Sequence, residues 1–177
     1  MIPEILKQNS REETNFPPNL YVVKTEAEEK GNLIFAFSYG SYFGGECETL
    51  IIDNGDGNCS IYAYGYNDFD LFWKFVMPNT ELESLEKVLQ PAKKWLRNYE
   101  VQEEIFDGYG WALQFRGNGY TIKTGGYMAN PWNFFRVANK IIKQLTVYKR
   151  KYSDDKMDDK LLPINGYKCC SYFKMNR

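Results

Sequence analysis

Two short glycine-containing segments constrain the fold of this chain more than any other feature. They are NGDG at residues 54–57 and Asn-Gly at residues 118–119. Both are flanked by runs rich in β-branched and aromatic residues: CETLIID and NCSIYAY around the first, WALQFR and YTIKTG around the second. Because Asn-Gly and Asp-Gly enter the backbone conformations of tight turns at low cost, this pattern predicts two antiparallel β-hairpins.

The first hairpin is predicted to close through a four-residue turn at 54–57, with Asp53 facing Asn58. In that register one face of the hairpin carries Leu50, Ile52, Cys59, Ile61 and Ala63. Cys47 then lies on the opposite face from Cys59, so a disulfide between the two is not expected. Free cysteines are usually buried, and Cys59 is predicted to be a small core residue.

The second hairpin is predicted to turn at 118–119, which pairs Phe115 with Ile122 and Leu113 with Thr124. Its apolar face then consists of Trp111, Leu113, Phe115 and Ile122, and its outer face of Gln114, Arg116, Thr121 and Lys123. This alternation is typical of a hairpin with one buried face.

Three further segments are predicted to be strands. They are NLYVVKTEA at 19–27, NLIFAFS at 32–38 and DLFWKFV at 70–76. The first two flank the turn-like sequence EEKGN, which favours a run of antiparallel strands from residue 19 to residue 64.

Two helices are predicted from their start signals. Thr80 and Glu83 form a capping-box pattern, so a helix should begin at Glu81 and be interrupted at Pro91. A second helix should follow residues 130–131, where an asparagine can cap and a proline fits the first turn. Its apolar stripe is predicted to be Phe134, Phe135, Ala138, Ile141, Ile142 and Leu145.

These elements predict a single α+β domain over residues 1–177, with a twisted antiparallel sheet of about six strands and two main helices packed on one face. The α+β core is expected at 19–148, a charged connector at 149–160, and a short C-terminal hairpin or extension at 161–177. The segments 47–67 and 110–130 echo each other, and each is followed by a helix. This echo favours two related hairpin-plus-helix units.

Composition disfavours several partners and sites. The 22 basic and 23 acidic residues nearly cancel, so no whole-molecule field attracts a nucleic acid. The N-terminus lacks a signal-peptide pattern and no apolar run approaches the ~20 residues of a membrane span, so a cytoplasmic protein with no membrane partner and with reduced cysteines is expected.

Catalytic and metal-binding signals are weak. The chain has no histidine, which removes Ser-His and Cys-His pairs and His-ligated metals. The sequence DNGDGN resembles a calcium loop, but Gly55 and Gly57 stand at ligand positions and Tyr64 stands where the ligating glutamate belongs. Cys169 and Cys170 lack metal-site spacing. No metal and no cofactor are therefore predicted, and the carboxylates left as acid–base candidates are Asp68, Asp70, Glu103, Glu104 and Asp107.

The excess of aromatic residues, 17% of the chain, is the main functional signal. Exposed tyrosine and tryptophan rings are typical of protein interfaces and sugar platforms. The candidate binding residues are Tyr39, Tyr42, Phe43, Tyr62, Tyr64, Tyr66, Tyr127 and Trp132. The alternative for the tyrosines is a second core layer. For the segment TGGYMANPWNFF at 124–135, the alternative to a binding surface is a strand-to-helix connection whose aromatic rings anchor the helix.

One set of motifs resembles a known kind of protein. Asp107-Gly108 with Trp111, Gly126-Tyr127, and Pro131 with Asn133-Phe134 are similar to the DG-x-x-W, GY and P-x-N-F ending of a family of small uncharacterised bacterial proteins. The similarity spans residues 33–145. It implies a strand-rich first half and a bacterial source, and it transfers no activity and no active site.

Taken together, these features favour a non-catalytic protein-binding module, with a toxin-neutralising immunity protein or another inhibitor of a bacterial conflict system as the particular case. The alternative is a carboxylate-dependent hydrolase or a carbohydrate-binding protein. A cleft with two facing carboxyl groups about 5 to 10 Å apart would favour the enzyme. A broad exposed tyrosine patch would favour the binding protein.

Overall fold

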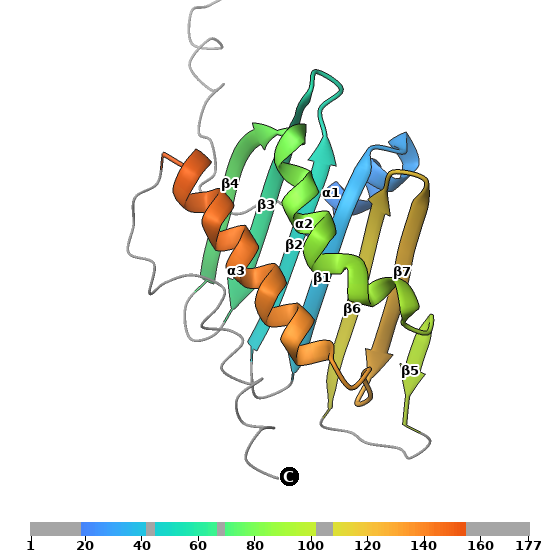
Figure 1. Ribbon diagram of the computed structural model, residues 1–177. Coiled ribbons are helices and arrows are strands. Elements are labelled where there is room, and N and C mark those ends of the chain that lie inside the picture. The colour runs from blue at the N-terminus through green and yellow to red at the C-terminus, as the bar shows by residue number, and fades with distance from the viewer. Residues whose placement is uncertain (1–18, 42–44, 67–69, 102–107, 155–177) are drawn as a thin grey trace, which may run out of the picture.

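The computed structural model describes residues 19–41, 45–66, 70–101 and 108–154. Seven strands form one sheet in the order β4-β3-β2-β1-β6-β7-β5 (Figure 1). The strands are β1 Leu33–Ser41, β2 Gly45–Asp53, β3 Asn58–Tyr66, β4 Asp70–Pro78, β5 Asn98–Glu100, β6 Tyr109–Gly117 and β7 Tyr120–Tyr127. The α-helices are α1 Leu20–Lys30, α2 Leu82–Leu89 and α3 Phe134–Tyr152, and the 3₁₀ helices are η2 Asn79–Glu81 and η3 Gln90–Lys94. The predicted α+β class is confirmed, with one more strand and one more helix than expected.

The chain builds the sheet in two parts. Strands β1 to β4 follow one another as an antiparallel meander. The chain then crosses the sheet through η2, α2 and η3 to the opposite edge, where β5 pairs in parallel with β7. The β6–β7 hairpin fills the space between β1 and β5, and α3 crosses back over the same face toward β4 (Figure 1).

The two faces of the sheet are covered unequally. Helices α2 and α3 lie on one face, here called the helical face, and α1 lies on the other, here called the α1 face (Figure 1). The helical face holds the large core, which includes Phe35, Phe37, Ile51, Ile61, Trp111, Leu113, Phe115, Leu85, Leu89, Phe134, Ile141 and Tyr148. The α1 face holds a small cluster of Leu20, Ala27, Leu33, Ala36 and Leu50.

The predicted strand at 19–27 is wrong, because this segment forms α1. The Asn19 side chain accepts a hydrogen bond from the backbone N–H of Tyr21 at 3.0 Å and caps the helix start. Gly31, with φ of 68°, adopts the left-handed conformation that ends it. Leu20 and Ala27 are both buried, seven residues apart, which suits one face of a helix and opposite faces of a strand.

The predicted register of the first hairpin is wrong by one residue. Asp53 faces Cys59, so the loop contains five residues, 54–58, rather than four. Side-chain oxygens stabilise the longer loop: Asp53 accepts from the N–H of Gly55 at 2.9 Å, and Asp56 accepts from the N–H of Asn58 at 3.0 Å. Several turn-forming residues in a row allow loops of more than one length, and these hydrogen bonds favour the five-residue loop.

A one-residue shift moves side chains to the other face. Leu50 and Ile52 therefore lie on the α1 face, whereas Cys59 and Ile61 lie on the helical face. Cys47 also belongs to the helical face, so the expectation that it lies opposite Cys59 is wrong. Both thiols are free, as predicted, and the predicted burial of Cys59 is confirmed; Cys47 is buried as well. The register separates the two by about 20 Å along the strands.

The second hairpin has the predicted register. Phe115 pairs with Ile122 and Leu113 pairs with Thr124, with Gly119 at φ of 80° in the turn. In a two-residue turn only one closure places the apolar residues on a single face, and the four predicted inward residues are buried.

The helix starts differ from prediction in detail. The segment after Pro78 opens as η2, and α2 begins at Leu82 without a side-chain cap, so the Thr80 capping box is not formed. The interruption at Pro91 is confirmed by η3. Helix α3 begins at Phe134 rather than at Pro131, and the predicted apolar stripe is buried, with Phe135 partly exposed.

The start of the predicted charged connector is also helical, since α3 continues to Tyr152. The remainder of the connector beyond residue 154, the predicted C-terminal hairpin, Cys169 and Cys170 lie outside the described residues. Within the described parts of the chain, no helix is both long enough and apolar enough to span a membrane.

Candidate functional site

The tyrosines of the predicted aromatic patch do not form one surface. Tyr39 is only 2% exposed and stacks on Tyr109, with ring centroids 5.6 Å apart, in the core of the helical face. Tyr62 and Tyr64 are half-buried on the α1 face beside the small cluster around Leu50. The core-layer alternative therefore holds for Tyr39, and Tyr62 and Tyr64 stay candidates for surface contacts.

Several predicted positions fall outside the description. Tyr42 and Phe43 lie outside the described residues, as do the carboxylate candidates Asp68, Glu103, Glu104 and Asp107. Tyr66 and Asp70 belong to β3 and β4, but their side chains lie outside the description.

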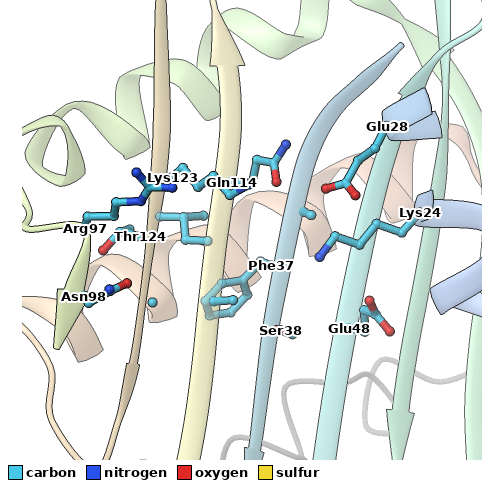
Figure 2. Close-up of a pocket in the computed structure, with 14 residues that line it drawn as sticks. Lys24, Glu28, Phe37, Ser38, Glu48, Arg97, Asn98, Gln114, Lys123 and Thr124 are labelled. Carbon is cyan, nitrogen blue, oxygen red and sulfur yellow. The ribbon is translucent and has the colours of Figure 1, made fainter. Parts of the chain in front are cut away.

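A groove of about 570 Å³ opens on the α1 face, where α1 leaves part of the sheet uncovered (Figure 2). Small residues of β1 and β6, among them Ala36, Ser38 and Ala112, line it together with Gln114. A groove of this size suits a small ligand or a short segment of a polymer.

Charged side chains border the groove on two sides. Arg97 precedes β5 and Lys123 lies on β7, which makes this side cationic. On the other side Lys24 of α1 extends between Glu28 of α1 and Glu48 of β2 (Figure 2). Sequence reasoning missed the groove because it read α1 as a strand. The signal that could have revealed it was the capping pair of Asn19 and Gly31 around an eleven-residue helix.

The second candidate surface is the loop between β7 and α3, residues 127–133, here called the 127–133 loop. It presents Trp132 to solvent with 83% of its surface exposed, and Tyr127 with 41% exposed. The residues on either side of Trp132, Pro131 and Asn133, are buried. The ring of Trp132 therefore points outward from between two packed neighbours.

Three aromatic side chains of the core fix the 127–133 loop by hydrogen bonds. Trp111 donates from Nε1 to the carbonyl oxygen of Ala129 at 2.9 Å. Trp95 donates from Nε1 to Oδ1 of Asn133 at 2.9 Å. The hydroxyl group of Tyr109 donates to Oδ1 of Asn130, which is therefore a loop anchor and not the helix cap that the sequence predicted.

The rings that fix the loop also pack on each other. Trp111 lies against Phe134, with ring centroids 4.4 Å apart, and Trp95 approaches Trp111 edge-on at 5.7 Å. Such pairs contribute about 0.5 to 1.5 kcal/mol each beyond their buried area. The loop therefore rests on a rigid aromatic base.

The glycine pair before the loop is required by close packing. A Cβ atom at Gly126 would lie 2.4 Å from the carbonyl oxygen of Ala129 and 2.6 Å from Nε1 of Trp111. Met128 adopts a left-handed φ of 54°, and its N–H donates to the carbonyl of Tyr109 at 2.9 Å. These constraints account for the glycines and the neighbouring core aromatics of the 124–135 segment, and they leave Trp132 without a role in packing.

The ring of Trp132 has a cationic neighbour. The guanidinium carbon of Arg136, one helical turn farther along, lies 5.2 Å from the ring centroid. At an exposed site such a cation–π contact contributes about 0.5 to 1 kcal/mol. Tryptophan and arginine, the residue types of this pair, are both enriched among the residues that dominate protein interfaces.

Reactive groups elsewhere in the described chain are protected. Burial raises the pKa of the Cys59 thiol to about 12, and the Asp53 carboxylate adds to the shift. The thiolate, which is the reactive form, is therefore suppressed at neutral pH. In the described residues no group of three or more His, Cys, Asp or Glu side chains is placed to hold a metal ion.

Comparison with known proteins gives no match: no protein-family model, no curated protein and no solved structure is significantly similar to the chain.

Proposed function

We propose that this protein is a non-catalytic protein-binding module whose interface is centred on Trp132. The observation that carries the proposal is a tryptophan ring, 83% exposed, on a loop fixed by hydrogen bonds from three core aromatics. Scattered exposed apolar residues are common on protein surfaces. A rigidly presented tryptophan that packs against no core residue is less so.

The physics of association favours such a residue as an anchor. Burying a large ring in a partner's pocket gains a large apolar area. The ordering cost is low, because the backbone of the 127–133 loop is already held in one conformation. Arg136 beside the ring adds a planar group that can stack or form paired hydrogen bonds with a carboxylate.

As the particular case we propose an inhibitor or toxin-neutralising immunity protein of a bacterial conflict system, acting in the cytoplasm. The motif resemblance supports a bacterial source. Inhibitors usually bind through interfaces of standard size, and the backbone of such interfaces moves little on binding. A side chain already held in one position, such as Trp132, fits an interface of this kind.

Site-specific photocrosslinking tests the proposal. A photoreactive phenylalanine replaces Trp132 in one variant and Tyr21 in a matched control, because Tyr21 is also a strongly exposed ring, at 74%, but lies on α1. We expect a discrete protein adduct from the source cell at position 132 and none at position 21. The purified partner should then bind Trp132→Ala more weakly than the wild-type protein. No protein adduct at position 132, or the same adducts at both positions, would contradict the proposal.

The groove on the α1 face supports the alternative function, carbohydrate binding or carboxylate-dependent hydrolysis. The specific observation is that two carboxylates, Glu28 and Glu48, line one groove with Lys24 between them. For this alternative, soluble oligosaccharides should shift NMR signals of groove residues. Glu28→Gln and Glu48→Gln should reduce either their binding or their turnover. Unchanged spectra across an oligosaccharide panel would eliminate it.

A further inference from the structure

The outer side of α3 carries a line of cations that begins one turn after Trp132. Its members are Arg136, Lys140, Lys143 and Arg150, all exposed, here called the α3 cationic line. Their spacing of four, three and seven residues keeps them on one side of a helix, and Val147 fills the remaining position. The line extends about 21 Å along the helix axis.

The composition of α3 differs from that of the rest of the chain. Its nineteen residues include six lysines and arginines and no acidic residue, in a protein whose net charge is −1. Two of the six serve the fold: Lys149 is buried with its ammonium group 4.4 Å from the ring centroid of Trp73, and Lys151 pairs with Glu81 at 2.6 Å. The remaining four make up the α3 cationic line. Arg150 also interacts within the protein, whereas Arg136, Lys140 and Lys143 are exposed and form no ion pair in the described residues.

The N-terminal part of this line opposes helix stability. Arg136 lies in the first turn, where the helix dipole favours acidic residues and disfavours cations, and that turn contains no acid. Arg136 and Lys140 are four residues apart, and Lys140 and Lys143 are three apart, so each pair is repulsive. Within the described residues these three side chains form no ion pair. Helix formation therefore does not account for them.

We propose that Trp132 and the α3 cationic line together form a docking surface for an acidic face of a protein partner. This inference rests on the proposed function and specifies the chemistry of the partner. Trp132 anchors one end of the contact, and the cations determine its direction along α3. Charge complementarity of this kind raises association rates and excludes partners with basic surfaces.

A protein partner fits this surface better than a nucleic acid does. Helix α2 packs beside α3 (Figure 1). It carries Glu83 and Glu86, and Glu81 of η2 directly precedes it, so the segment next to α3 is acidic. The continuous phosphate backbone of a nucleic acid would be repelled by these acidic residues. A protein surface can instead place carboxylates opposite the cations and lysines opposite the acids. The net charge of −1 also gives no long-range attraction for a polyanion.

A membrane surface fits less well for a different reason. A helix that lies in a bilayer interface inserts its apolar side. The apolar side of α3 is buried against the sheet through Phe134, Ile141 and Leu145. On the exposed side of α3 itself only Val147 would remain for insertion, together with Trp132 just before the helix.

Binding of defined probes tests the docking surface. The probes are a labelled alanine-based helical peptide with glutamates along one face, a single-stranded oligonucleotide of the same formal charge, and vesicles containing anionic phospholipid. The test variant is Arg136→Glu/Lys140→Glu/Lys143→Glu. The matched control is Lys30→Glu/Lys74→Glu/Lys94→Glu, which changes the net charge equally at other exposed positions that do not line the groove. Circular dichroism and thermal melting confirm that both variants are folded.

We expect the acidic peptide to bind most tightly and its affinity to fall about tenfold or more in the α3 variant, because three attractive charges become repulsive. Trp132→Ala should also weaken it, and the control variant should change its affinity by less than about threefold. Equal losses in the two triple variants, or tighter binding of the oligonucleotide or the vesicles, would overturn the inference.

The partner crosslinked at position 132 separates this inference from the proposed function. If that partner binds the α3 variant as tightly as the wild-type protein, the docking surface is wrong and the protein-binding function stands. If no protein crosslinks at position 132, the function itself is wrong, and the inference falls with it. If the partner binds wild type but its affinity falls at least about tenfold in the α3 variant, both are supported.

Discussion

The inner and outer sides of α3 differ in how completely folding accounts for them. On the inner side Phe134, Ile141 and Leu145 are buried against the sheet. On the outer side Trp132 and Arg136 begin a line of exposed residues that continues through Lys140 and Lys143. The inner side is what a sheet needs in order to be covered, whereas the proposed docking surface is our explanation of the outer side.

This difference indicates how the two sides work together. Because the inner side is packed against a large core, the backbone of α3 is rigid, and the 127–133 loop that precedes it is fixed by Trp95, Tyr109 and Trp111. A rigid helix can present outer residues that cost a little stability. Substitutions on the two sides should therefore have opposite patterns of effect.

The largest expected effect is on the inner side. Phe134→Ala should lower the free energy of unfolding by about 3 to 5 kcal/mol, since the ring is 1% exposed and packs on Trp111. Phe135→Ala is the control and should cost less, because Phe135 is only partly buried. Urea melts measure both. Small and equal losses would show that the inner side of α3 is not a core face.

The next effect concerns the connection between core and loop. Trp95→Phe removes the donor for Oδ1 of Asn133, whose side chain is buried, and should cost about 1 to 3 kcal/mol. Asn133→Ala and the double variant complete a thermodynamic cycle that isolates the hydrogen bond from the change in ring size. Additive losses would mean that this bond does not hold the loop.

A thiol in the inner layer gives a pH-dependent effect. The pKa of Cys59 is raised to about 12 by burial, so between pH 9 and 12 the unfolded chain loses this proton while the folded chain keeps it. The stability that depends on this group is complete below pH 9. Above pH 9 the free energy of unfolding should fall by up to about 1.4 kcal/mol per pH unit. Comparing unfolding free energies at pH 8 and pH 10 tests this.

Cys59→Ala is the control for the pH effect. It should flatten the pH dependence in this range, leaving the part due to tyrosines, such as Tyr120, whose pKa burial raises to about 12. In the wild-type protein Cys59 should also react slowly with thiol reagents. An unchanged slope in the variant, or rapid labelling of Cys59, would contradict the burial of this thiol.

The smallest expected effect is on the outer side and has the opposite sign. Arg136→Glu should raise the free energy of unfolding by about 0.5 kcal/mol net. An acid in the first turn suits the helix dipole and the repulsion of Lys140 is removed, which together outweigh the loss of the cation–π contact with Trp132. Lys94→Glu, at another exposed position, controls for the change in net charge. A loss above about 1 kcal/mol would show that Arg136 supports the fold.

Sequence reasoning predicted the strands best where the turn allowed only one hairpin register. The Asn118-Gly119 turn fixed the second hairpin, since any other register would expose its apolar face. In the first hairpin several turn residues were adjacent, and hydrogen bonds from Asp53 and Asp56 decided the loop length. For α1 the β-forming pair Val22-Val23 favoured a strand, but the cap at Asn19 prevailed.

The candidate site was less predictable for physical reasons. Trp132 was identified among the aromatic candidates, but exposure depends on the packing of Pro131 and Asn133, which no spacing reveals. Tyr39 is covered because α3 crosses β1, a long-range contact. The spacing of the α3 cationic line was visible in the sequence, although the near-zero net charge concealed it.

The most direct test of the central claim compares two free energies for Trp132→Ala. The free energy of unfolding should change by no more than about 0.5 kcal/mol, because 83% of the side chain is exposed. The free energy of binding to the partner captured at position 132 should weaken by about 2 kcal/mol or more, since a buried tryptophan anchor usually dominates an interface. A partner that binds the variant undiminished would contradict the account, as would a loss of stability as large as that of Phe134→Ala.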